Sequence, residues 1–391
     1  MLAGRIYYID GLRGVLAVIV FVHHYFYLFC PDLVFGGNYE DFTNTGAFSF
    51  YKIIALTPIN IFFNPGMAIH FFFLLSGYVQ TQSYFLNPDV SFLQKSMLKR
   101  YFRLAIPVVS VLMLVYICHS LFLIRKDLVP FNSLTSGWLR SMLPNTLKFQ
   151  SVILEGLVNC FRGNSRYYQI LWTMPTELIN SFVVLSLLLV FHNLKFKLEV
   201  FAVLILVQFI VLQEYYSVAF TVGMVLAKLE VDSNKFKNIL STPFVHYGCL
   251  SLGLYFGSYP FTGYQNAAAN SVYAPISFFE VYPHIISYLI GVIFLFCFLL
   301  YSKTVTRLLS KKIFLFFGEI SFMFYLIHFL ILLSLSPALY SQLKDKNSSL
   351  DFMITGIVSF TAVTVAAYIL TRLIDKPVIK WCNHFVRKFF N

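Results

Sequence analysis

The chain has 391 residues, of which 58% are apolar, 19% aromatic and only 12% charged. A soluble domain carries roughly 25% charged residues, so this composition excludes a soluble enzyme, a disordered chain and a collagen-like fibre. The net charge of +12 indicates basic loops beside membrane lipids rather than a nucleic-acid partner, because Lys and Arg concentrate in the cytoplasmic loops of membrane proteins. We therefore expect a multi-pass integral protein of the plasma membrane or an internal membrane.

Apolar runs long enough to cross about 30 Å of hydrocarbon predict an all-α protein with about ten transmembrane helices. Eight runs cover 11–30, 65–85, 104–124, 171–191, 243–258, 284–301, 313–336 and 352–372. The stretch 198–229 contains two shorter runs separated by Gln213 and Glu214. In this arrangement 19 of the 29 Lys and Arg residues fall on one side and nine on the other. The positive-inside rule then places both termini in the cytoplasm and the segments 31–64 and 125–170 outside it.

The chain is predicted to form one domain over residues 1–391, without a repeat, a low-complexity tract or an appended soluble domain. Its start, MLAGRIYYIDGLRG, lacks the cleavage site of a signal peptide, so the first span is expected to be retained. Six cysteines stand singly without a C-x-x-C pair. This pattern indicates neither a zinc ribbon nor a disulfide framework, and no metal site is predicted.

Ionisable side chains inside a span cost at least a few kcal/mol and therefore mark function or mutual pairing. In the first span Arg13 and His24 are eleven residues apart, which puts them on one helix face about 16 Å apart along the axis. Arg13 is expected near the inner boundary and His24 in the outer half, with Asp10 pairing with Arg13 or capping the helix. The alternative is that Arg13 is a topological anchor and His24 a satisfied interfacial histidine.

Charged residues also occur at both ends of later spans. Arg100 and Arg103, one turn apart, face the cytoplasm, where they either follow the positive-inside rule or bind phosphate groups. Glu177 is predicted just inside the outer boundary and needs a cationic or hydrogen-bonding partner, a role that an intramembrane histidine would fill.

Uncharged polar residues share the same spans. Ser76 lies in the second span, where the LSG sequence is typical of helix packing. Ser321, Tyr325 and His328 follow at i, i+4 and i+7, which aligns their polar tips on one stripe of the ninth span. The stripe serves either a polar cavity with acid/base capacity or only hydrogen bonds between helices.

These residues belong to a recognisable pattern. In chain order it consists of the run from D-G-L-R-G to His24, then FFFLLSGY, KRYFRLAIP, LWTMPTE, FTVGMVLA, ISFMFYLIH and LIDKP. This order resembles the motifs of the integral-membrane acyltransferase 3 family, in particular its fungal and other eukaryotic members. The resemblance extends from residue 9 to about 377. The chain departs from the family pattern at Asp375, where Glu is commoner, and at His70, and it lacks the esterase-like domain of some bacterial members.

The resemblance implies transfer of an acyl group, usually acetyl, from cytoplasmic acyl-CoA to a hydroxyl group at the opposite face, without a permanently bound cofactor. The acceptor is a glycan, a lipid or a small molecule. The family match implies a catalytic set of His24, Glu177 and His328, in which His24 is the general base and Glu177 orients or stabilises it. Arg13, Arg100 and Arg103 would hold the donor phosphates, and the supporting residues would be Asp10, Ser76, Trp172, Ser321, Tyr325 and Asp375.

Three other classes of protein fit parts of the pattern. A transporter or channel would use the same His and Glu residues for a small solute or a proton. The absence of an inverted repeat weakens that reading. The membrane-bound acyltransferases with a buried His and Asn lack the ordered motifs above. A scaffold role gives no reason for polar groups at this depth.

Overall fold

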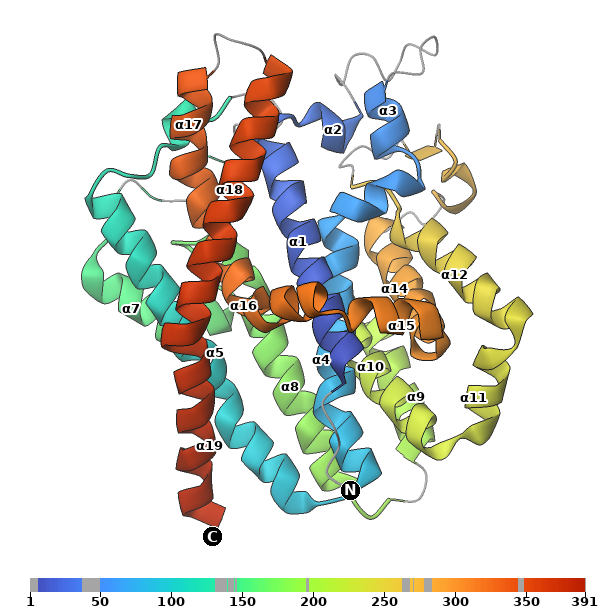
Figure 1. The fold of residues 1–391 in the computed structure, drawn as a ribbon. Helices are drawn as coiled ribbons and strands as arrows, with labels where there is room; N and C mark the ends of the chain where they lie inside the picture. Colours follow the sequence, from blue (N-terminus) through green and yellow to red (C-terminus); the bar gives the residue numbers. More distant parts are fainter. Residues whose placement is uncertain are drawn as a thin grey trace. The chain divides into compact units, whose positions relative to one another are not determined.

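The computed structural model describes residues 6–36, 50–130, 139, 144, 146–194, 197–261, 268–269, 271–277, 283–343 and 348–390. Every regular element in these ranges is a helix, so the all-α prediction is confirmed for them (Figure 1). Within the same ranges six helical segments are long and apolar enough to cross a membrane: Tyr7–Phe29, Val90–Ser120, Gln169–Val190, His284–Tyr301, Lys312–Leu333 and Ser349–Phe390.

The remaining predicted spans are helical as well. The run 65–85 forms α4 (Pro65–Leu86) and the run 243–258 forms α12 (Pro243–Gly257). The stretch 198–229 divides as expected, into α9 (Lys197–Leu206) with the π-turn η6 (Val207–Val211) and then α10 (Tyr215–Asp232). The break falls at Gln213, whose φ of 53° is left-handed and ends a right-handed helix. Ten crossings with both termini on one side remain a prediction.

The chain forms two compact units. Unit 1 contains Met1–Val20, Asp32–Met97 and Ile179–Gly318, and unit 2 contains Phe21–Pro31, Leu98–Leu178 and Glu319–Asn391. Four helices continue from one unit into the other: α1 (Tyr7–Phe29), α5 (Val90–Ser120), α8 (Thr173–Val190) and α16 (Lys312–Leu333).

Unit 1 is built on close contacts between helix backbones. A Cβ atom on Gly77 of α4 would lie 1.9 Å from the carbonyl oxygen of Phe220 in α10, and one on Gly223 would lie 2.0 Å from that of Leu74. The first turns of α1 approach the start of α16 in the same way, since a Cβ on Gly14 would lie 2.5 Å from the Gly318 nitrogen. Small residues at such crossings are typical of helix packing in membranes. The other elements of this unit are α2 (Asp32–Phe35), α3 (Phe50–Ala55), η2 (Pro58–Phe63), α11 (Asn234–Ser241), η7 (Ala274–Ile276), α14 (Pro283–Tyr301) and α15 (Lys303–Leu309).

Unit 2 packs the end of α1 against α16 and α18 (Ser348–Leu370). The ring of Phe21 lies 5.9 Å from that of Phe324 and 5.5 Å from that of Phe360, and the Tyr25 hydroxyl donates to the Phe352 carbonyl. These contacts hold the part of α1 that carries His24 at a defined position beside α16. The other elements are η3 (Lys126–Leu128), α7 (Phe149–Leu157), η4 (Asn159–Arg162), η5 (Gln169–Trp172), α17 (Leu335–Leu343), η8 (Thr371–Asp375) and α19 (Lys376–Phe390).

Candidate functional site

The residues predicted for the site are divided between the two units. His24, Arg103 and Asp375 are among those in unit 2, together with Arg100, Trp172, Glu177, Ser321, Tyr325 and His328. Asp10, Arg13 and Ser76 lie in unit 1. The site is therefore described from unit 2, and the parts assigned to the three residues of unit 1 stay predictions.

Two predicted catalytic histidines meet in unit 2. The Nε2 atom of His328 lies 3.1 Å from Nδ1 of His24, and Nδ1 of His328 lies 2.6 Å from the carbonyl oxygen of Tyr325. A carbonyl only accepts, so the neutral His328 ring carries its proton on Nδ1 and offers the lone pair of Nε2. His24 must then donate from Nδ1, which leaves the lone pair of its ring on Nε2.

This pair has the arrangement of a base held by a second group. His24 is half-buried, whereas His328 is 1% exposed and the adjacent His23 is 3% exposed. The ring of Phe329 meets that of His24 edge-on at 5.3 Å. A proton taken up at Nε2 of His24 would make its Nδ1–H a charge-assisted donor to His328, and such hydrogen bonds are about twice as strong as neutral ones. The pair can thus accept a proton without a carboxylate.

Tyr325 connects the histidine pair to the segment before α8. Its hydroxyl donates to the carbonyl of Ile170 at 2.7 Å and lies 3.0 Å from Oγ1 of Thr173. At the next residue of α16, the Tyr168 hydroxyl donates to the carbonyl of Leu326 at 3.0 Å. The part of α16 just before His328 is therefore hydrogen-bonded at two adjacent residues to residues 168–173.

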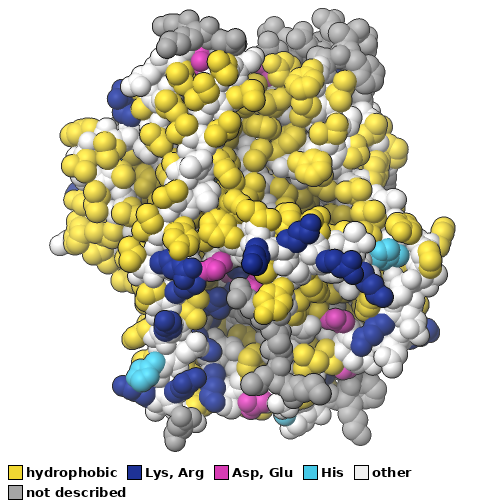
Figure 2. Space-filling view, viewed as in Figure 1, with side chains coloured by type: hydrophobic (Ala, Val, Ile, Leu, Met, Phe, Trp, Pro, Cys, Tyr) yellow, Lys and Arg dark blue, Asp and Glu magenta, His cyan; other side chains and the backbone are white. Residues whose placement is uncertain are grey.

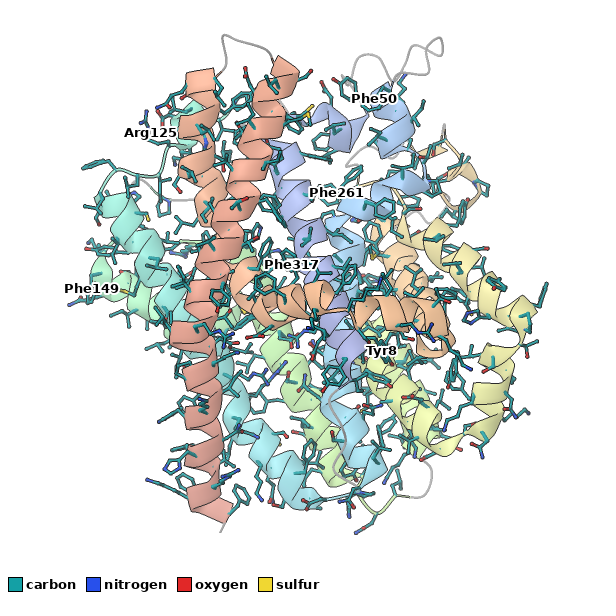
Figure 3. All side chains as sticks on the ribbon, viewed as in Figure 1. Tyr8, Phe50, Arg125, Phe149, Phe261 and Phe317 are labelled. Carbon is teal, nitrogen blue, oxygen red and sulfur yellow. The ribbon has the colours of Figure 1, made fainter. Side chains whose placement is uncertain are left out.

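The segment that contains these residues includes short helices packed against α5, whereas an extracytoplasmic loop was predicted for 125–170. Helix α7 lies along α5: the ring of Phe149, labelled in Figure 3, is 5.8 Å from that of Tyr116, and the Tyr101 hydroxyl donates to the carbonyl of Leu157 at 2.6 Å. Tyr101 lies between Arg100 and Arg103, which were predicted to face the cytoplasm, so that side and an outer location for all of 125–170 cannot both hold. Short apolar helices separated by turns are below the length that identifies a span, and the sequence pattern therefore missed this segment.

Glu155 holds the irregular part of that segment in place. It is 1% exposed, and its Oε1 accepts hydrogen bonds from the backbone nitrogens of Arg166 at 2.7 Å and Tyr167 at 3.5 Å. Backbone N–H groups at such depth need internal partners, and the buried carboxylate supplies one. Sequence reasoning missed Glu155, since an acid within an assumed outer loop carries no signal. It also missed Thr173, although that residue belongs to the quoted LWTMPTE motif.

Glu177 forms an ion pair with Arg100, and each side chain is 14% exposed. The need for a cationic partner is confirmed. Glu177 was predicted at the outer boundary and Arg100 on the cytoplasmic side. Two residues so placed could not touch, so at least one of the two predicted depths is wrong. The same segment is involved, because α8 begins beside Tyr325 of α16. Orientation of His24 by Glu177 stays a prediction.

The other predicted residues of unit 2 differ in their exposure. Ser321 is 4% and Asp375 8% exposed, the latter within the π-turn η8, whereas Trp172 is 40% exposed. Arg103 and Lys99 lie close enough to the Cys382 thiol of α19 to interact with it electrostatically. No group of three or more His, Cys, Asp or Glu side chains that could hold a metal ion occurs among the described residues.

Unit 1 contains two polar clusters of its own. Nδ1 of His70, a residue with 0% exposure, lies 2.7 Å from the Gly66 carbonyl, and its ring lies 4.7 Å from that of Tyr216. The hydroxyl of Tyr78 donates to Glu230, and Nε2 of Gln82 donates to the same carboxylate at 3.2 Å. These bonds connect α4 to α10 beyond their glycine contact.

Comparison with known proteins identifies relatives of the whole chain. The profile of the acyltransferase 3 family, described as an acyltransferase domain, matches residues 6–373. The chain is also similar to acyltransferase R4 of Phoma sp., with 22% identity over 97% of this chain and 95% of that protein. No solved structure matches the chain significantly.

Proposed function

Because this chain belongs to the acyltransferase 3 family and is an acyltransferase, we propose that it transfers an acyl group, acetyl in the first instance, from cytoplasmic acyl-CoA to a hydroxyl group on the extracytoplasmic side. The acceptor is a glycan, a lipid or a small molecule. The observation that carries this proposal is the hydrogen-bonded series from Tyr325 O through His328 to His24, which supplies a base with a defined tautomer.

In the proposed reaction the acceptor hydroxyl donates a hydrogen bond to Nε2 of His24. The base takes this proton as the hydroxyl oxygen attacks the thioester carbonyl carbon. The resulting imidazolium donates from Nδ1 to His328, which is itself anchored on the Tyr325 carbonyl. General base catalysis of this kind contributes a factor of about 10² to 10⁴ in rate.

Collapse of the tetrahedral adduct breaks the carbon–sulfur bond. The leaving thiolate takes the proton from Nε2 of His24, so the products are the ester and free CoA, and the histidine pair returns to its starting tautomers. His24 is half-buried beside a ring of Phe329, and the low water content of such an environment disfavours hydrolysis of the thioester.

Cationic side chains in the same unit support the choice of donor. Arg100 and Arg103 lie one turn apart on α5, and guanidinium groups bind phosphate oxygens in pairs. Arg100 already contacts Glu177, so a phosphate at Arg100 would compete with a carboxylate. We assign the direct phosphate contact in this unit to Arg103, whereas Arg100 connects α5 to α8. The donor contact predicted for Arg13 of unit 1 stays a prediction.

The proposal is tested with the purified full-length protein in lipid nanodiscs, with radiolabelled acetyl-CoA and a total lipid and glycan extract as the acceptor pool. We expect label in an acceptor fraction and release of free CoA, both abolished by His24→Ala at unchanged expression and thermal stability. Label transfer that persists in His24→Ala would refute the assignment of the base. Movement of a solute without CoA release would instead support the transporter alternative.

A further inference from the structure

The C-terminal helix continues a membrane-spanning helix well past the length that a bilayer requires. Residues Ser349–Phe390 form 42 residues of unbroken helical backbone through α18, η8 and α19, and α19 continues directly from the end of α18 in Figure 1. At 1.5 Å per residue this is about 63 Å, against about 30 Å of hydrocarbon. Because α18 alone has 23 residues, α19 lies beyond the membrane.

Helix α19 packs on the beginning of α5, which is itself 31 residues long. The ring of Phe102 lies 5.5 Å from that of Trp381 and 5.9 Å from that of Phe385, and Nζ of Lys99 donates to Oδ1 of Asn383 at 3.2 Å. The buried residues of α19 are Val378, Cys382 and Val386. The two helices thus form a paired projection with a fixed register.

This projection carries only positive charge. Neither α5 nor α19 contains an Asp or Glu, and together they hold eight Lys and Arg residues: Lys95, Lys99, Arg100, Arg103, Lys376, Lys380, Arg387 and Lys388. Figure 2 shows Lys and Arg side chains gathered along α19, whereas hydrophobic side chains cover α18. Acids of other helices face these cations: Glu177 of α8 pairs with Arg100, and Glu319 of α16 pairs with Lys376 and, at 3.5 Å, with Arg372.

Four of these cations form one row. At 100° per residue, Lys376, Lys380 and Arg387 fall within about 40° of the helix circumference, and Lys99 joins them through Asn383, next to the same face. Lys380 and Arg387 are exposed, and Lys99 is half-buried. We name Lys99, Lys376, Lys380 and Arg387 the basic stripe. Its exposed members, Lys380 and Arg387, lie opposite the buried apolar face of α19, so these two are not needed for packing.

The direction of the basic stripe decides between two sources of anionic groups. Lipid headgroups lie in one plane across the end of α18, whereas Arg387 is eleven residues past Lys376, about 16 Å farther along the axis. A headgroup layer is only about 6 Å thick on each side, so one membrane surface cannot contact both ends of the row. A flexible polyanion that extends along the helix can.

We propose that the basic stripe binds the nucleotide end of the CoA thioester, with its diphosphate and 3′-phosphate distributed along α19. This inference rests on the proposed function, which supplies the donor. Arg103 connects the two, because it lies on α5 close to Cys382 of α19. The stripe would capture the donor from the cytoplasm and hold its phosphates while the acyl end enters unit 2, so it governs donor affinity rather than the chemical step.

The test measures binding of unacylated CoA to the full-length protein by calorimetry, in nanodiscs of zwitterionic lipid. An exposed ion pair contributes a factor of about two to five, so the double variant Lys380→Gln/Arg387→Gln should raise the Kd about 4- to 25-fold and the acyl-CoA KM likewise, with kcat unchanged. The charge reversal Lys380→Glu/Arg387→Glu should weaken binding further. Both sites are exposed, and an unchanged melting temperature confirms folding. The matched control is Lys235→Gln, an exposed lysine of α11, with an unaltered Kd.

Three outcomes overturn the inference. Unchanged Kd and KM in both double variants, with acyl transfer intact in the wild type, would refute the basic stripe and leave the proposed function standing. No CoA binding by the wild type would refute the donor and the stripe together. If the double variants lose binding to vesicles containing phosphatidylserine but keep the CoA affinity of the wild type, the basic stripe binds the membrane surface instead. We also expect the wild type to bind dephospho-CoA more weakly than CoA. A smaller difference between the two ligands in the double variant would support contact between the basic stripe and the 3′-phosphate.

Discussion

Replacing His328 with Phe separates the two histidines of the proposed base. Phe fills a similar volume at a position that is 1% exposed, but it offers no acceptor to Nδ1 of His24, which lies 3.1 Å from His328 Nε2 in the wild type. The imidazolium that forms in the transition state would then lose its partner. Substrate binding, by contrast, should change little, since His328 is placed behind His24.

The magnitude follows from the hydrogen bond that is lost. A hydrogen bond to a charged group contributes about 1.5–3 kcal/mol, and each 1.36 kcal/mol of barrier is about tenfold in rate. We therefore expect His328→Phe to lower kcat about 10- to 150-fold at nearly constant KM. His328→Gln, whose amide oxygen can accept from His24, should recover part of this loss.

The assay is release of CoA thiol from acetyl-CoA by purified protein, with kcat and KM measured for wild type, His24→Ala, His328→Phe and His328→Gln. His246→Phe, at a ring that packs on Phe298 in unit 1, controls for loss of a histidine elsewhere. A His328→Phe enzyme with kcat within twofold of wild type, beside an inactive His24→Ala, would refute the stabilisation of His24 by His328.

Three further predictions concern the structure around the pair. Tyr325→Phe removes the hydrogen bond to Ile170. It should lower kcat up to about tenfold, since a hydrogen bond contributes about 0.5–1.5 kcal/mol. An unchanged kcat would show that residues 168–173 do not support the site. Glu155→Ala leaves buried N–H groups without their acceptor at an expected cost of about 1–3 kcal/mol, so its melting temperature should fall more than that of Glu155→Gln, which keeps an acceptor; equal melting temperatures would contradict this. Gly14→Val should destabilise the protein more than Gly248→Val, because a Cβ at Gly14 clashes with Gly318 whereas Gly248 faces open space; thermal scanning in detergent measures both.

Much of the fold is readable from hydrophobic pattern alone. Each run of apolar residues proposed as a span is helical, and the break at Gln213 was located correctly. The segment 149–172 was not recognised, because its helices are too short to register as a span and are stabilised by contacts with α5 and α16 rather than by their own length. Because residues 125–170 were predicted to lie outside the membrane, Glu177 was predicted far from Arg100, with which it forms an ion pair.

The sequence by itself determined that the chain belongs in a membrane, that its long apolar runs are helical, which family the ordered motifs indicate, and that His24 and His328 are polar residues within apolar runs. Only the tertiary structure decided that these two histidines touch, which tautomers they adopt, that Glu177 contacts Arg100, and that the cations of α5 and α19 stand together. The reason is physical: composition and periodicity act along one helix, whereas a hydrogen bond or an ion pair between helices depends on their rotation and depth, which are set by side-chain packing between residues far apart in the chain.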